Sequence, residues 1–340
     1  MKRSDTLDNK NTNSCPPCAK KTSIGGQALI EGIMMRGPEY TAMAVRNPEG
    51  EIVLEKWKTT STFKAKIFKV PFIRGIFNFI DSMKMGYKTL MRSAEIAGLE
   101  DEPVPKKNAD EGEPEGAPEA KKEPTKASKI GMDILMFFSA LLGIVLAVAL
   151  FLWLPAQLYS WLGKLVPAVE GNRFLRSAFE GVFRIVIFVL YIVLVSRMKD
   201  IHRTFMYHGA EHKTIFCYEQ GLPLTVENVR AQKRFHPRCG TSFMMLMLLV
   251  GIIIGMFIPA TLPALYRTAI KILLLPLTVG IGYELIKLAG RRDNAVTRAF
   301  SAPGVWLQHI TTVEPDDSMI ECAIKAFTEV IPEEENKDNW

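Results

Sequence analysis

Cysteine is scarce in this 340-residue chain, and that scarcity excludes one class of protein. The cysteines are few, odd in number and irregularly spaced, so a disulfide-stapled secreted scaffold is excluded and a reducing, cytoplasm-facing setting is favoured. Residues 1–21 lack an apolar core, so we expect no signal peptide. The five cysteines are Cys15, Cys18, Cys217, Cys239 and Cys322.

Charge of one sign is also lacking, because 42 Lys and Arg stand against 36 Asp and Glu. The excess of +6 is mild, and no basic motif interleaved with aromatic residues accompanies it. Such motifs are typical of nucleic-acid-binding proteins. We therefore expect no nucleic-acid partner.

Long apolar runs are what the chain has in abundance. Residues 134–154 and 241–266 carry no charge over 21 and 26 positions, enough to cross a hydrocarbon core of about 30 Å. We expect the second of these spans to end near Pro259. Two further spans are predicted at about 174–196 and 268–288, although buried core helices remain the alternative for both. The earlier of these contains charges at i, i+4 and i+8, which share one helix face and can pair: Arg176, Glu180 and Arg184.

Basic residues set the predicted orientation. The loop 197–240 holds eight Lys and Arg, whereas the loop 155–174 holds two. Because basic loops favour the cytoplasm, we predict a multi-pass protein of the inner (cytoplasmic) membrane with both termini inside. Residues 1–130, 197–240 and 289–340 are then cytoplasmic.

The region before the spans divides into three predicted parts. Residues 1–22 read as a disordered polar tail, in which Cys15-Pro-Pro-Cys18 is half of a zinc-binding pattern. Residues 23–99 contain a predicted β-hairpin, 41–46 and 51–57, around the turn Asn47-Pro48-Glu49-Gly50. Residues 100–129, rich in Glu, Pro, Lys and Ala, predict a disordered acidic linker.

A basic amphipathic stretch at 63–98 lies between the hairpin and the linker. Such a stretch predicts contact with an anionic lipid surface as well as the bilayer itself, the alternative being a helix on a soluble core. The fold class is therefore mainly α, a polytopic membrane protein with about four transmembrane helices, a small N-terminal β-hairpin region and amphipathic interfacial helices. A transmembrane bundle at 130–300 and a cytoplasmic C-terminal segment at 301–340 complete it.

The chemistry is concentrated in the loop 197–240. If Tyr207-His208-Gly209-Ala210-Glu211-His212-Lys213 is helical, His208 and His212 lie one turn apart on one face and can share a metal ion. Glu211 beside them can accept a proton from water. The order His-x-x-Glu-His is that of inverted zinc hydrolases, although Gly209 weakens a helix.

Three more residues extend the candidate site. His236 and Cys239 precede the third span, and Glu284 lies in the fourth, near its predicted cytoplasmic end. An ionisable residue inside a span is a functional candidate. The alternative is a structural lattice in which Glu284 pairs with an arginine such as Arg238 and the histidines are hydrogen-bonded in an interfacial core.

Residues 25–37 are rich in glycine and contain two methionines, with one acidic residue, Glu31, and one basic residue, Arg36. No Gly-Lys-Ser/Thr follows, so this is no phosphate loop. Two interpretations remain, a packed strand and turn or a segment whose glycines allow close approach to the site.

Four blocks of the sequence resemble the signature of the YqhQ-like family of bacterial integral membrane proteins. They are residues 25–36, 207–213, 234–243 and 302–308, and the resemblance covers about 23–330. That family is built on a domain of unknown function and is labelled a predicted metal-dependent enzyme. The resemblance implies a membrane protein and no established set of catalytic residues.

Two functions are therefore expected. The first is a metal-dependent, zinc-type hydrolase with a cytoplasm-facing site, its metal zinc or another divalent transition ion bound by His208 and His212, with Glu211 as general base. His236, Cys239 and Glu284 complete the candidate ligand set. The second is a non-enzymatic transporter subunit or scaffold whose His, Glu and Cys cluster is structural.

Overall fold

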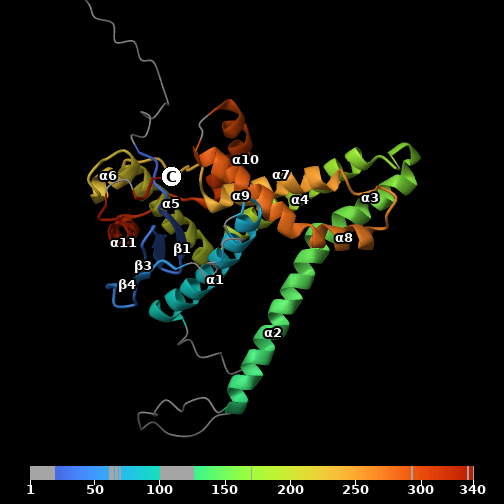
Figure 1. Ribbon diagram of the computed structural model, residues 1–340. Coiled ribbons are helices and arrows are strands. Elements are labelled where there is room, and N and C mark those ends of the chain that lie inside the picture. Colours follow the sequence, from blue (N-terminus) through green and yellow to red (C-terminus); the bar gives the residue numbers. More distant parts are fainter. Residues whose placement is uncertain are drawn as a thin grey trace, which may run out of the picture.

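The computed structural model describes residues 20–60, 65, 68, 70–99, 126–169, 171–291, 294–334 and 337–339. Most of the predicted tail and linker, including Cys15 and Cys18, lies outside these residues. The fold is mainly helical with one small sheet near its N-terminus (Figure 1), as the sequence predicts. Thr22, placed in the tail by the sequence, is buried and bridges to Asn339.

The sheet is an antiparallel meander of four strands in sequence order. Its strands are β1 (Gly25–Leu29), β2 (Gly32–Arg36), β3 (Tyr40–Arg46) and β4 (Ile52–Lys58). The predicted hairpin is confirmed as β3–β4, with Arg46 opposite Ile52. Gly50 in the turn between them has a φ of +87°, a conformation that glycine adopts without strain. The glycine- and methionine-rich run forms β1 and β2, which confirms the strand-and-turn interpretation. One of its glycines, Gly26, also approaches the candidate site closely, because its N–H contacts Glu211.

Both faces of the sheet are covered, which explains why β2 has no polar side chain before Arg36. On one face Ile33 and Ala44 pack with residues of α5 (Lys199–Glu219) and α11 (Asp317–Thr328). On the other face Met34 and Met43 form a second cluster that contacts side chains of α1 (Ile73–Ile96). Alternate residues thus enter opposite cores, as the strand period of two requires. A short helix, α6 (Val226–Arg230), adjoins α5 and α11.

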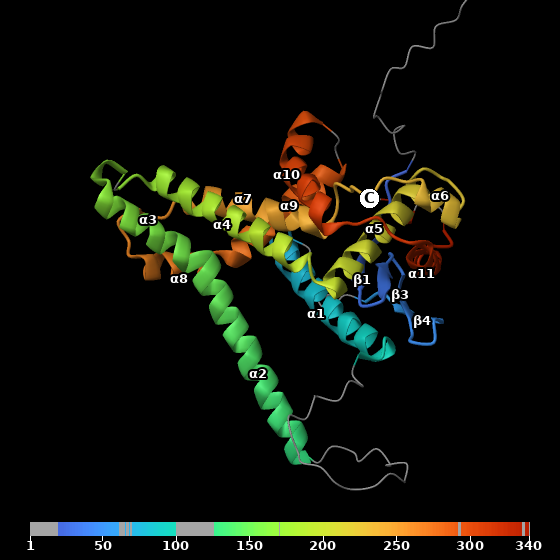
Figure 2. The same cartoon turned by 180° about the vertical axis from the view of Figure 1, so that it is seen from behind.

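The remaining helices form the apolar part of the molecule. They are α2 (Lys126–Val148), the π turn η3 (Ala149–Trp153), α3 (Leu154–Leu165), the 3-10 turn η4 (Pro167–Val169), α4 (Arg173–Val195), α7 (Gly240–Gly255), α8 (Ala264–Leu273), α9 (Leu275–Arg291) and α10 (Ala295–Thr311). In both views α2 extends away from the other helices (Figures 1 and 2).

Within the described residues, two helices are long and apolar enough to cross a membrane. They are Phe138–Leu165, of 28 residues, and Arg173–Val195, of 23. The pair α8 and α9 would add a third span, but it bends by 51° at its break. The helix α7 is apolar but too short for this criterion. The described residues thus contain two or three candidate spans, whereas the sequence predicts about four spans.

The boundaries of the predicted spans differ from the structure for local reasons. The first apolar helix runs past residue 154 although Pro155 has no N–H to donate. The π turn η3 precedes this proline, and Nε of Arg184 donates to the carbonyl of Phe151, four residues before Pro155. The break between α8 and α9 falls at Leu274, two residues before Pro276, which has no N–H to continue the helical hydrogen bonds of α8. The linker also ends earlier than expected, because α2 begins at Lys126.

The predicted charge pairing within α4 is present. Arg176 Nε lies 3.1 Å from Glu180, and Arg184 lies 3.8 Å from the same carboxylate. All three side chains are buried. The sequence did not predict that Arg267 and Lys271 of α8 join them.

Candidate metal centre

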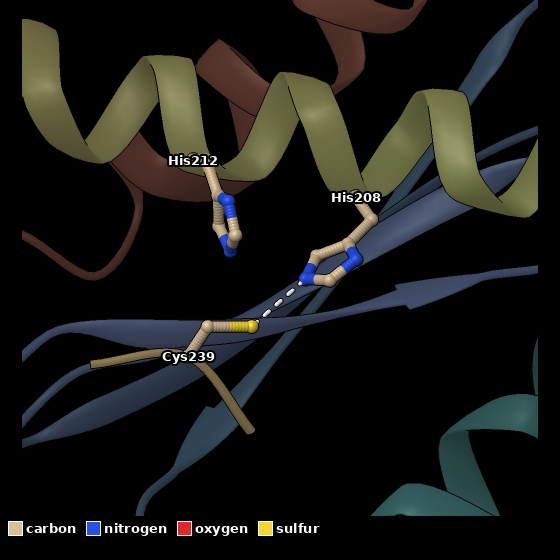
Figure 3. A group of neighbouring side chains, drawn as sticks. All are labelled: His208, His212 and Cys239. Atoms are coloured by element: carbon tan, nitrogen blue, oxygen red, sulfur yellow. Dashed lines mark hydrogen bonds between the residues drawn. The ribbon is translucent and has the colours of Figure 1, made fainter. Parts of the chain in front are cut away.

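Helix α5 carries the histidine motif, and its helical geometry is confirmed. The helix is continuous over 21 residues, so His208, Glu211 and His212 at i, i+3 and i+4 share one face. The half of α5 that follows Tyr207 is buried between the sheet and α11. Figure 3 shows both imidazoles on one side of the α5 ribbon.

Cys239 supplies the third member of the group. It precedes α7 in an extended conformation (φ −77°, ψ 152°), and its sulfur lies opposite the two imidazoles (Figure 3). The Nε2 atom of His208 is 3.0 Å from Sγ of Cys239. One ligand atom from each of His208, His212 and Cys239 lies within 4.8 Å of the other two. Two histidine nitrogens and a cysteine sulfur at such spacing are a donor set typical of zinc.

Backbone carbonyls orient both imidazoles toward the shared space. Nδ1 of His208 is 2.8 Å from the carbonyl oxygen of Thr311 at the end of α10. Nδ1 of His212 makes the equivalent contact with the carbonyl oxygen of Arg234. Because a carbonyl only accepts, each Nδ1 carries a proton, and Nε2 is the nitrogen left to bind a metal, as in the histidines of metal sites.

His212 is 1% exposed, yet its Nε2 has no hydrogen-bond partner among the described residues. A buried polar atom without a partner costs about 1–3 kcal/mol. That cost is removed if an electron-pair acceptor occupies the space between His212 Nε2, His208 Nε2 and Cys239 Sγ.

The charges of the pair His208 and Cys239 are coupled. Burial raises the pKa of the Cys239 thiol, but the two imidazoles outweigh burial and hold that pKa well below its usual 9.0. Burial likewise lowers the pKa of His208, and the Cys239 sulfur and the Glu211 carboxylate reverse the effect and raise it to about 9. The sulfur is therefore held as a thiolate, the form that binds metal.

Glu211 lies beside the group without belonging to it. Its carboxylate is 6% exposed and accepts a 3.1 Å hydrogen bond from the backbone N–H of Gly26 in β1. Burial raises the pKa of Glu211 above 4.5, and the two imidazoles oppose that rise. A carboxylate made more basic by burial is a better proton acceptor near neutral pH.

His236 is close to the group but is directed elsewhere. Its ring centroid is 5.6 Å from that of His212, while its Nε2 lies 3.1 Å from the Arg238 guanidinium and 3.9 Å from the Glu219 carboxylate. Burial lowers the pKa of His236 to about 4, although Glu219 acts in the opposite direction. The structure thus places His236 in a polar cluster adjacent to the candidate metal centre.

Glu284 is not brought to the group at all. Its carboxylate accepts a 2.7 Å hydrogen bond from Nε of Arg74 and a 3.3 Å hydrogen bond from the backbone N–H of Phe72. The pair joins α1 to α9. Arg238, named in the structural alternative as a partner of Glu284, instead pairs with Glu219.

The supporting residues of the centre were not predicted. Thr311 and Arg234 act through backbone carbonyls, which leave no signal in side-chain chemistry. Gln308 is fully buried, accepts from the backbone N–H of His236 and donates to its carbonyl, and so fixes the segment that leads to Cys239. Its only signal in the sequence is its position in the block at 302–308.

Comparisons with known proteins point to one family. The family model described as "Protein of unknown function (DUF1385)" matches residues 70–333. The "Uncharacterized protein YqhQ" of Bacillus subtilis (strain 168) is 34% identical over 311 residues, which cover 91% of this chain and 92% of that protein. No solved structure matches the chain.

Proposed function

This chain belongs to the DUF1385 family, and from that premise we propose that it is a membrane-associated, metal-dependent hydrolase of the zinc type. We assign the metal to His208, His212 and Cys239. Glu211 is its proton acceptor. Because the family is described as one of unknown function, the proposal is carried by the residues of this chain.

One observation carries the proposal: three soft or borderline donor atoms converge, and one of them, Nε2 of His212, is buried and makes no hydrogen bond within the part of the chain that the structure describes. A purely structural cluster would be expected to satisfy that atom, because more than nine in ten buried polar groups are paired. The carbonyls of Thr311 and Arg234 support the same conclusion, since each holds a proton on Nδ1 and leaves Nε2 as the nitrogen that can bind a metal.

The donor atoms fit a tetrahedral ion after a small adjustment. Zinc–nitrogen and zinc–sulfur bonds of about 2.0 and 2.3 Å place the two donor atoms about 3.6 Å apart. His208 Nε2 and Cys239 Sγ are 3.0 Å apart, so they would separate by roughly half an ångström. Three protein ligands leave a fourth position open, as in catalytic rather than structural zinc sites.

Glu211 is the residue that accepts and returns the proton during the proposed hydrolysis. When bound, zinc supplies Lewis-acid activation of water. Glu211 precedes His212 on the same helix face, and the N–H of Gly26 holds one of its carboxylate oxygens in place. Its raised pKa suits it to receive a proton from water and return it to a leaving group.

We propose further that the centre faces the cytoplasm at the inner membrane, as the basic loop 197–240 suggests. The exposed side of α1 supports contact with anionic lipid, because apolar and basic residues alternate there. Met83 and Tyr87 lie beside the exposed Lys84 and Lys88.

The test separates chemistry from metal binding. Glu211→Gln keeps the size of the side chain and removes its basicity, so we expect metal content to survive while complementation of a deletion phenotype is lost. His208→Ala should lose both. The matched control is His202→Ala, an exposed histidine on the same helix, which should lose neither.

The same experiment identifies the alternative. Full complementation by Glu211→Gln together with failure of His208→Ala would make the metal structural and the protein a non-enzymatic membrane component. If neither substitution changes metal content or growth, the proposal is wrong.

A further inference from the structure

A second buried charge cluster lies among the apolar helices, apart from the candidate metal centre. Glu180 of α4 is 1% exposed and contacts four cationic side chains, from α4 and α8. All four are less than 9% exposed, and no other carboxylate of the described residues forms an ion pair with them. The cations are Arg176, Arg184, Arg267 and Lys271. One negative charge against four leaves a buried excess of three positive charges.

Backbone carbonyls accept hydrogen bonds from three of these cations but do not cancel their charge. Arg176 donates to the carbonyl of Ala260, and Arg267 donates to those of Ile258 and Pro259. Nε of Arg184 donates to the carbonyl of Phe151 at 2.8 Å. Phe151 lies in the π turn η3, a geometry that disrupts the regular helical hydrogen bonds and is frequent at functional sites.

Arg184 remains incompletely satisfied. Its NH2 group is buried and makes no hydrogen bond to any described residue, and its nearest ion-pair contact is Glu180 at 3.8 Å. Charged groups inside apolar helices are expensive and mark ligand or ion sites. The NH2 group of Arg184 lies within a cluster that has an excess of three positive charges. We therefore expect an anion to bind there.

A cavity of about 250 Å³ adjoins these groups. Arg184 and Lys271 are its two charged lining residues, and the rest of its wall is almost wholly apolar, with Phe188, Met247 and Leu274 among its members. The cavity lies at the break between α8 and α9 and reaches the side of η3. Its walls thus suit a hydrocarbon chain, while its two cations suit an acidic head.

We propose that this cavity binds a single-chain amphiphile with a carboxylate head, of the fatty-acid class. The carboxylate accepts from the free NH2 of Arg184 and from Lys271, because guanidinium and ammonium groups bind carboxylates with charge-assisted hydrogen bonds. The hydrocarbon chain lies along the apolar wall, to which α7 contributes the most residues.

Depth favours a free acid over a bilayer phospholipid. Arg184 is eleven residues from the start of α4 at Arg173, which corresponds to about 16 Å along the helix axis. A phospholipid headgroup is anchored near the bilayer surface, whereas a single-chain acid can bring its head that far into the protein. This binding site does not depend on the metal centre.

The experiment measures binding of radiolabelled oleate to the full-length protein in a neutral detergent. We expect saturable binding of about one equivalent. Because a lost charge-assisted hydrogen bond weakens binding about tenfold or more, Arg184→Gln and the uncharged methyl ester of the ligand should each show that loss. Arg173→Gln, which removes an exposed arginine from the same helix, should bind as the wild type does.

A second variant tests the cavity without touching its charges. Gly251 of α7 lines the cavity, and a Cβ added there meets no atom within 4 Å. Gly251→Leu therefore begins its side chain in open space at the cavity wall, reduces the space left for a ligand and should abolish binding. Gly143→Leu on α2, also in open space, should leave binding unchanged.

Three results would overturn the proposal. One is equal binding of oleate and its methyl ester, which would show a plain hydrophobic groove. Another is unaltered oleate binding by Gly251→Leu. The third is displacement of oleate by phosphatidylglycerol in equimolar amounts, which would identify a bilayer lipid as the occupant.

Discussion

Gly209 offers a sharp test of how the metal centre is held. An added Cβ at Gly209 would lie 2.1 Å from the carbonyl oxygen of Val313, whereas ordinary contact begins at 3.4 Å. In Gly209→Ala the segment after α10 must therefore retreat by about 1.3 Å. That segment is tied to α5 by the 2.9 Å hydrogen bond from Val313 N–H to Phe205 and by the contact of Thr311 with His208.

Two opposing effects determine how much Gly209→Ala changes the free energy of unfolding. Overpacking costs about 1–3 kcal/mol, while replacing glycine by alanine inside a helix contributes up to about 1 kcal/mol of stability. Because the obstructing atom is backbone, we expect Gly209→Ala to lower the free energy of unfolding by about 2 kcal/mol. Displacing the Thr311 carbonyl from His208 should also weaken zinc binding by about 10–100-fold.

The assay pairs denaturation in detergent with zinc competition against a chelator. Gly251→Ala is the matched control, because its Cβ enters open space in α7 and only the helix-propensity gain remains. Equal stability of the two variants, with wild-type zinc affinity in Gly209→Ala, would refute the close packing on which the centre depends.

Three further predictions concern acidity, helix pairing and topology. The metal-free His208 has a pKa of about 9 and must lose its proton to bind a metal. Zinc affinity should therefore rise with pH up to about 9 and then level off. An affinity that does not change with pH would contradict the assignment of His208 as a ligand. Arg74→Gln should lower the free energy of unfolding by about 1–2 kcal/mol, because it releases α1 from α9. Adding Glu284→Gln to this variant should lower it little further. Additive losses in unfolding experiments would show that the two residues are not coupled. A reporter fused after Lys164 should be exported and one fused after Lys213 should not, and export of the second would place the metal centre outside the cytoplasm.

Local sequence signals predicted much of the fold. The turn Asn47-Pro48-Glu49-Gly50 located the β3–β4 hairpin, because proline and glycine restrict its geometry directly. The i, i+4 spacing predicted the Arg176–Glu180 contact, because it depends on one helix alone. Strands β1 and β2 were less visible, since a sheet buried on both faces lacks an alternation of polar and apolar residues.

The candidate site was predictable where it depends on one helix, and only partly where it depends on packing between elements. His208, Glu211 and His212 share a face by helical geometry, and Cys239 does join the two histidines. Glu284 was grouped with them because it was predicted to lie at the same depth in the membrane. Depth does not reveal which helix packs beside Glu284, and in the structure that helix is α1. His236 lies in the same loop as Cys239, but its imidazole contacts Arg238, which is paired with Glu219, and not the metal-binding group.

Zinc X-ray absorption on the purified full-length protein tests the central claim most directly. We predict about one equivalent of zinc whose coordination shell contains one sulfur at roughly 2.3 Å and nitrogen or oxygen atoms at roughly 2.0–2.1 Å. The sulfur contribution should disappear in Cys239→Ser and persist in Cys322→Ser, a buried cysteine of α11 that lies outside the group. Zinc bound only through oxygen, or sulfur that survives Cys239→Ser, would contradict the account.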